Sequence, residues 1–234
     1  MIRRRCIKKT LLAVLLGSFA FASFAQPITI EKQGAFSAGG TVIEAKKTFD
    51  PYHPEPDAMT LHGDHANVIY QIPVHAKNIS LMFLHGAGQS MRTWQTTPDG
   101  REGFQSVFLR KGYPVYLIDQ PRRGDAGRAT VDGTIKASPD EQFWFGQFRM
   151  VLWPKFYDNS AFASQKDLNS FWRQMTPNTG PYNDKVIADA VTDALKKSEG
   201  TVLVTHSQGC GPGWLIGTEA GNNLKGIIAL EPGS

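Results

Sequence analysis

Four short apolar runs, each ending at a polar residue or a glycine, constrain the fold of this chain more than any other feature of its sequence. The runs lie at residues 79–84, 115–118, 201–205 and 227–230. Continuous apolar runs of this length are typical of parallel strands that are buried on both faces. We therefore predict that these four segments form the centre of a mostly parallel β-sheet.

Segments with helical patterns lie between the predicted strands. Residues 101–112 end in a lysine–glycine pair, and residues 183–200 carry apolar side chains at helical spacing and close with a glycine. Strands that alternate with helices predict βαβ units, and hence an α/β fold with helices on both faces of the sheet. Ahead of these units, residues 27–45 predict a hairpin that turns at Gly39-Gly40, and residues 65–74 predict a further strand.

The first 25 residues have the pattern of a secretory signal peptide. A basic start is followed by an apolar stretch and by Ser23 and Ala25, small residues at the −3 and −1 positions of a cleavage site. The alternative is a membrane anchor, but the apolar stretch is shorter than the roughly 20 residues that a spanning helix needs. We therefore predict that residues 26–234 form the mature domain, that it is periplasmic or secreted, and that it is not inserted in a membrane.

The positive charge of the chain belongs to this signal segment. The formal charge is +4, but residues 1–25 hold five basic residues and no acidic one, which leaves the mature chain with 20 basic and 21 acidic residues. This balance gives no support to nucleic acid or an anionic membrane as a partner. Of the two cysteines, Cys6 lies in the signal, so the mature chain has no internal disulfide. No cluster of residues has metal-ligand spacing, and we expect neither a metal nor a cofactor.

Residues 130–180 differ from the rest of the chain because they are rich in aromatic residues and contain no predicted strand. The aromatic residues are Phe143, Trp144, Phe145, Phe148, Trp153, Phe156, Tyr157, Phe162, Phe171 and Trp172. They indicate either helices packed on the main body or a cap-like insertion over a site, since aromatic side chains supply apolar surface for an organic ligand. The two interpretations are compatible.

The sequence THSQG at residues 205–209 is a candidate for a nucleophilic serine. In open α/β sheets ligands bind at the carboxyl ends of the strands, and a serine on a sharp strand-to-helix turn has its hydroxyl exposed there. The usual pattern is G-x-S-x-G, and here Thr205 replaces the first glycine. The alternatives are an ordinary serine in a glycine-rich loop and a phosphate-binding loop, but the lysine of such a loop is absent.

Two further strand ends carry residues that suit acyl transfer. The oxyanion of such a reaction needs backbone N–H donors, which we assign to Gln208, after the serine, and to Ala87 in the sequence FLHGAGQS, with Gly88 as the alternative. In this architecture the acid follows the serine, and Glu231 stands 24 residues after Ser207 at the end of the next apolar run. His85 is interpreted as a structural residue of its loop.

The chain resembles the α/β-hydrolase superfamily and, within it, a group of secreted bacterial esterases related to an Alcaligenes esterase. The resemblance covers roughly residues 35–234 and rests on the segment 81–124 and on the sequences VTHSQGCGPGW and IIALEPG. It implies an α/β-hydrolase fold, Ser207 as nucleophile, an oxyanion hole from Ala87 and Gln208, Glu231 as the acid, and carboxylic esters as the substrate class.

The catalytic histidine of this family follows the acid, but all six histidines of the chain precede Ser207. We therefore expect an esterase-like serine hydrolase that is truncated at its C-terminus. The chain as given is expected to be inactive because it lacks the catalytic histidine. The alternatives are a non-catalytic secreted binding protein that retains the pocket, and a lipase-like enzyme with residues 140–157 as a mobile lid. The expected ligand is a small-molecule ester. The sequence does not decide whether the protein forms a homodimer.

Overall fold

The computed structural model describes residues 27–148, 150, 152–158, 160, 162 and 164–233. The predicted signal segment, residues 1–25, lies outside the described residues. Among the described helices, none combines the length and the apolar character that crossing a bilayer requires.

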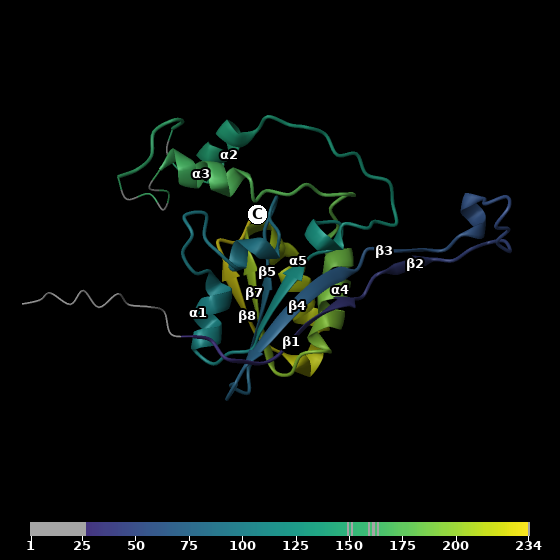
Figure 1. The fold of residues 1–234 in the computed structure, drawn as a ribbon, viewed down its shortest axis with the longest axis horizontal. Helices are drawn as coiled ribbons and strands as arrows, with labels where there is room; N and C mark the ends of the chain where they lie inside the picture. The colour runs from purple at the N-terminus through teal and green to yellow at the C-terminus, as the bar shows by residue number, and fades with distance from the viewer. Residues whose placement is uncertain are drawn as a thin grey trace, which may run out of the picture.

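The core is a six-stranded sheet with the order β1-β4-β6-β5-β7-β8 (Figure 1). The strands of the molecule are β1 (Ile30–Ala38), β2 (Thr41–Ile43), β3 (Leu61–Gly63), β4 (Ala66–Pro73), β5 (Ser80–Leu84), β6 (Val115–Asp119), β7 (Thr201–His206) and β8 (Leu224–Leu230). Strands β6, β5, β7 and β8 are parallel, and β1 and β4 add an antiparallel edge. The four apolar runs are these four parallel strands, so the predicted fold class is confirmed.

Helices cover both faces of the sheet, as Figure 1 shows. The α-helices are α1 (Phe104–Arg110), α2 (Glu141–Gln147), α3 (Gln165–Trp172), α4 (Asp184–Leu195) and α5 (Cys210–Glu219). Alternate residues of β5 point to opposite faces: Met82 and Leu84 belong to a core cluster with α4, whereas Leu81 and Phe83 belong to a second cluster with α1. Burial on both faces is why the strand sequence is continuously apolar.

The predicted hairpin of residues 27–45 is wrong in its pairing. Both of its runs are strands, but β1 pairs with β4 and β2 pairs with β3. Gly39 and Gly40 both have positive φ, and a Cβ added to Gly39 would lie 2.7 Å from the Cα of Ala190. The two glycines therefore take the chain closely past α4 and out into the β2–β3 arm, which projects from the body in Figure 1.

The aromatic-rich segment forms α2 and α3, which lie beyond the carboxyl ends of the parallel strands in Figure 1. It has a cluster of its own, in which Phe145, Met150, Leu168 and Trp172 are buried. The helical, aromatic-rich character predicted for this part of the fold is therefore confirmed.

A buried ion pair ties the arm to the sheet. Arg122 donates from Nε and Nη2 to the two carboxylate oxygens of Asp64, at 2.7 and 2.9 Å, and Thr130 also donates to Asp64. Both charged side chains are buried. The hydrogen bonds from Arg122 lower the pKa of Asp64 to about 2. This pair joins the loop before β4 to the loop after β6, and Thr130 adds the segment that leads to α2.

We expect Asp64→Asn to lower the free energy of unfolding by about 3–5 kcal/mol at pH 7, because it leaves the buried Arg122 charge without its partner. The depressed pKa implies that the wild-type contribution is complete above about pH 4 and is lost as the pH falls towards 2. Urea denaturation at several pH values measures both effects.

The control is Asp189→Asn, which breaks the exposed ion pair with Lys185 and should cost less than about 1 kcal/mol. Equal stability losses in the two variants would contradict the role given to Asp64.

Candidate active site

Ser207 stands at a strained turn between β7 and α5. Its φ is +50°, a left-handed conformation that is uncommon for residues other than glycine. Two glycines allow this turn to pack closely: a Cβ on Gly86 would lie 2.9 Å from the Cβ of Ser207, and one on Gly209 would lie 2.5 Å from the carbonyl oxygen of His85. The turn and the loop after β5 are thus in backbone-to-backbone contact.

Thr205 occupies the place of the usual first glycine, and a glycine elsewhere makes room for it. The Thr205 side chain is fully buried, with Oγ1 3.1 Å from Sγ of Cys210. A Cβ on Gly213, one turn into α5, would lie 2.9 Å from the Thr205 methyl group. The crowding expected from Thr205 is therefore relieved from the helix side.

Both ring nitrogens of His85 have hydrogen-bond partners other than Ser207. Its Nδ1 donates to the Gly86 carbonyl at 3.1 Å, and its Nε2 accepts from the Gln120 N–H at 3.4 Å. Burial, together with the charge of Arg123, lowers the pKa of His85 to about 3. The ring is therefore neutral near pH 7, and its 3.7 Å approach to Asp119 is not an ion pair. These contacts describe a structural residue.

His206 has a hydrogen-bond partner in the loop after β5. Its Nδ1 lies 3.1 Å from Oε1 of Gln89, which in turn accepts from the Gly86 N–H at 3.2 Å. Burial lowers the pKa of His206, and the charge of Glu231 opposes this shift. Gln89, which sequence reasoning missed, therefore links the β5 loop to the residue before Ser207.

The structure brings the segment of Glu231 beside Ser207. Leu230 is opposite His206 in the parallel ladder, and Glu231 follows it with a φ of +44°. Two residues later, the Gly233 N–H donates to the Ser207 carbonyl at 3.2 Å. The Glu231 side chain is exposed and acts electrostatically on His206.

A cavity of about 710 Å³ lies between these loops and the aromatic segment. Ala87 and Gln208, the two predicted oxyanion residues, both line it, whereas Ser207 is not among its lining residues. The aromatic segment contributes Trp144, Phe148 and Trp172. Trp144 and Trp172 each stack on Phe148, at centroid distances of 5.5 and 6.4 Å. The cavity thus combines an apolar wall with the polar backbone at the strand ends.

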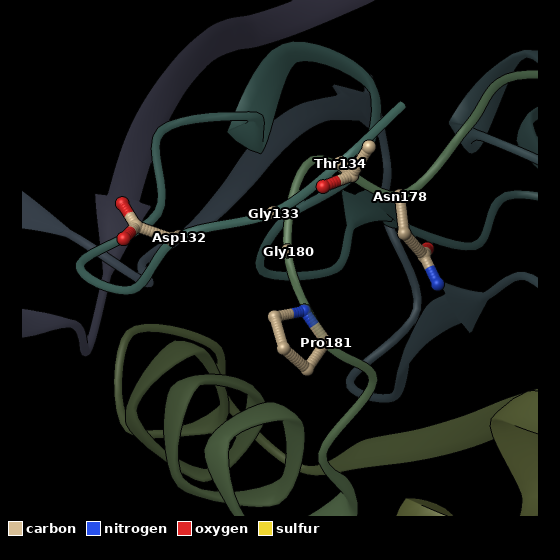
Figure 2. A pocket seen from close by; sticks show the side chains of 6 residues that line it. All are labelled: Asp132, Gly133, Thr134, Asn178, Gly180 and Pro181. Carbon is tan, nitrogen blue, oxygen red and sulfur yellow. The ribbon is translucent and has the colours of Figure 1, made fainter. Parts of the chain in front are cut away.

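A second cavity, of about 330 Å³, adjoins the first. Asp132, Gly133, Thr134, Asn178, Gly180 and Pro181 line it, and Figure 2 shows Asp132 and Asn178 on opposite sides of it. Asn178 lines both cavities. No predicted site residue borders this smaller cavity.

The fit between Thr205 and Gly213 predicts a coupling that a double-mutant cycle can measure. We expect Gly213→Ala to lower the free energy of unfolding by about 1–3 kcal/mol, because the added methyl group overpacks against Thr205. In a Thr205→Gly background the clash is absent, and alanine's higher helix propensity should make the same change neutral or stabilising by up to about 1 kcal/mol.

Urea denaturation of the four proteins gives the coupling energy. Gly146→Ala is the matched control, since a Cβ at this helical glycine meets nothing within 4 Å. The same cost for Gly213→Ala in both backgrounds would refute the proposed fit.

Comparison with known proteins agrees with this geometry. No family model matches the chain. The chain is similar to a solved bacterial esterase, with a TM-score of 0.75 and 28% identity, over 89% of this chain and 70% of the esterase. It is also 33% identical over 161 residues to the "Probable secreted lipase phiG" of Fungal sp. (strain ATCC 74256), a match that covers 65% of this chain and 44% of the lipase.

The chain thus spans less than half the length of the lipase and most of the length of the esterase. The mostly parallel sheet, the helices on both of its faces and the likeness to the bacterial esterase lead to one assignment. The chain has the α/β-hydrolase fold and is similar to a bacterial esterase.

Proposed function

We propose that the protein is a serine hydrolase of the esterase type, with Ser207 as the nucleophile. The observation that carries this proposal is the positive φ of Ser207 on a sharp turn between a strand and a helix. Such a turn raises a side chain above the carboxyl end of the sheet, where a substrate carbonyl can approach it. Similarity to a bacterial esterase supports the same chemistry.

The oxyanion of the tetrahedral intermediate is proposed to accept hydrogen bonds from the backbone N–H groups of Ala87 and Gln208. Both residues border the same cavity, and the Gly86 backbone abuts Ser207. Donors that are fixed before the reaction stabilise the developing charge without reorganisation. The position of both residues on one cavity, with Gln208 directly after Ser207, favours this assignment.

Attack by Ser207 requires a base, because a serine hydroxyl is a weak nucleophile at its ordinary pKa. We assign to Glu231 the role of orienting that base. His85 and His206 have other hydrogen-bond partners, and no hydrogen bond between described residues joins the other four histidines to Ser207. The base is therefore proposed to be a histidine outside these six, and the activity is proposed for the whole protein.

The substrate is proposed to be a carboxylic ester of a small organic molecule. Trp144, Phe148 and Trp172 offer a flat apolar wall opposite the strand ends, which favours an apolar acyl or alcohol group on that side. Residues 130–180 would then act as a cap over the site. Similarity to a secreted lipase, together with the signal pattern of residues 1–25, favours export to the periplasm or the medium.

The alternative is a secreted binding protein that retains the cavity without catalysis. The observation that favours it is that no histidine among the described residues is hydrogen-bonded to the Ser207 hydroxyl, while the 710 Å³ cavity is present. Such a protein would bind small esters without turning them over.

Hydrolysis of p-nitrophenyl butyrate distinguishes these proposals. We expect the 234-residue chain to hydrolyse this ester at close to the uncatalysed rate. The protein encoded by the longest reading frame that contains it should be active. In the active protein, Ser207→Ala should lower kcat by about 10³-fold or more, because the remaining acceleration comes from binding and the oxyanion hole alone.

Ser37→Ala, at an exposed position of β1, is the control and should retain full activity. Activity of the longer protein that survives Ser207→Ala would overturn the assignment of the nucleophile. Strong Ser207-dependent turnover by the 234-residue chain would overturn the assignment of the base.

A further inference from the structure

Arg123 is a buried cation at the boundary between the cavity and the strand ends. Its side chain is 2% exposed, and it lines the cavity together with Ala87 and Gln208. Among the described residues, its guanidinium donates to three neutral acceptors: the Gly86 carbonyl, the Gln208 side-chain oxygen and the Asn178 side-chain oxygen. No ion pair between described residues joins it to a carboxylate. One guanidinium thus connects the β5 loop, the turn after β7 and the segment after α3.

The contact with Gly86 acts on a particular peptide group. The Gly86 carbonyl belongs to the same peptide unit as the Ala87 N–H, and in a planar trans peptide the two groups point in opposite directions. Arg123 Nη1 donates to this carbonyl at 2.7 Å, a shorter distance than the 3.1 Å from His85 Nδ1 and the 3.4 Å from the Gln89 N–H. Because the charged donor is also the strongest, Arg123 dominates the orientation of this peptide.

The contact with Gln208 reaches the side chain of the residue whose backbone N–H is the other proposed donor. Arg123 Nη2 lies 3.3 Å from Oε1 of Gln208, whose backbone carbonyl accepts from the Tyr182 hydroxyl at 3.2 Å. Asn178 accepts from Nε at 2.6 Å and also from Nη2. The cation is therefore held by three residues, and it contacts the Gly86–Ala87 peptide directly and Gln208 through its side chain.

We propose that Arg123 is a positioning residue of the oxyanion hole, which orients the Gly86–Ala87 peptide so that its N–H points to the substrate and supplies positive charge beside the developing oxyanion. This role rests on the proposed function. It predicts that Arg123 stabilises the transition state and adds little to the affinity for the substrate. The reason is that a polarised and correctly oriented N–H matters most when the carbonyl oxygen carries a full charge.

The test uses the whole protein with Ser207-dependent esterase activity, and the variants Arg123→Gln and Arg123→Lys. We expect Arg123→Gln to lower kcat by roughly 10²-fold, comparable to the loss of an oxyanion donor, with KM changed by less than about threefold. Arg123→Lys keeps the charge but loses the planar set of donors, and it should recover part of the loss.

A trifluoromethyl ketone analogue of the substrate provides a second readout. Its affinity should fall in parallel with kcat/KM across wild type, Arg123→Lys and Arg123→Gln, whereas the affinity for the neutral alcohol product should be unchanged. Arg92→Gln, at an exposed position after the same loop, is the control and should match wild type in all measurements. Thermal unfolding confirms that each variant is folded, and if Arg123→Gln is not, Arg123→Lys decides.

A folded Arg123→Gln protein with unchanged kcat overturns the positioning role and leaves the proposed function intact. A variant in which KM rises and kcat is unchanged also overturns it, because Arg123 would then bind substrate. Wild-type protein without Ser207-dependent hydrolysis overturns both proposals.

Discussion

The left-handed backbone of Ser207 is the constraint on which the rest of the site depends. A residue with a side chain in this conformation is strained, so the turn persists only because its surroundings leave it no alternative. Gly86 and Gly209 allow the loop after β5 and the start of α5 to close on the turn, and Gly213 accepts the Thr205 methyl group beneath it. Adding side-chain atoms at any of these three glycines would push the turn apart.

The parallel sheet determines which loops meet at this turn. Strands β6, β5, β7 and β8 are neighbours that run in the same direction, so their carboxyl ends share one edge. The loops that follow them supply Arg123, Ala87, Ser207 and Glu231 in that spatial order. The aromatic helices α2 and α3 lie over this edge (Figure 1), and the cavity forms where they meet the loops. The site is thus a consequence of strand order and direction.

The sequence predicts the parts of this arrangement that depend on local pattern. Strands β5, β6 and β7 are buried on both faces, and their apolar runs are visible without further knowledge. The run of β8 is equally visible, although this edge strand is only partly buried. The pairing of β1 could not be predicted, because the Gly39-Gly40 pair that resembles a hairpin turn instead passes α4 closely, a contact with residues about 150 positions away. Thr205 looked like a defect of the motif because its compensation, Gly213, lies in the following helix.

The position of the Arg123 side chain could not be predicted from the sequence, for a related reason. Arg122 and Arg123 are adjacent residues of the same type. Arg122 has a positive φ, and the two side chains reach different parts of the structure. Arg122 binds Asp64 in the arm, and Arg123 reaches the β5 loop and Gln208. Their partners lie between 37 and 85 positions away, and nothing in the local sequence distinguishes a structural arginine from one beside the cavity.

The central claim is that the strained turn makes Ser207 a nucleophile. Reaction of the whole protein with a fluorophosphonate, followed by peptide mass spectrometry, tests it directly, since this reagent modifies serines that are activated for acyl transfer. We expect a single adduct on Ser207 that is absent from Ser207→Ala and from protein unfolded before labelling. An ester-hydrolysing protein whose adduct lies on another residue would contradict it.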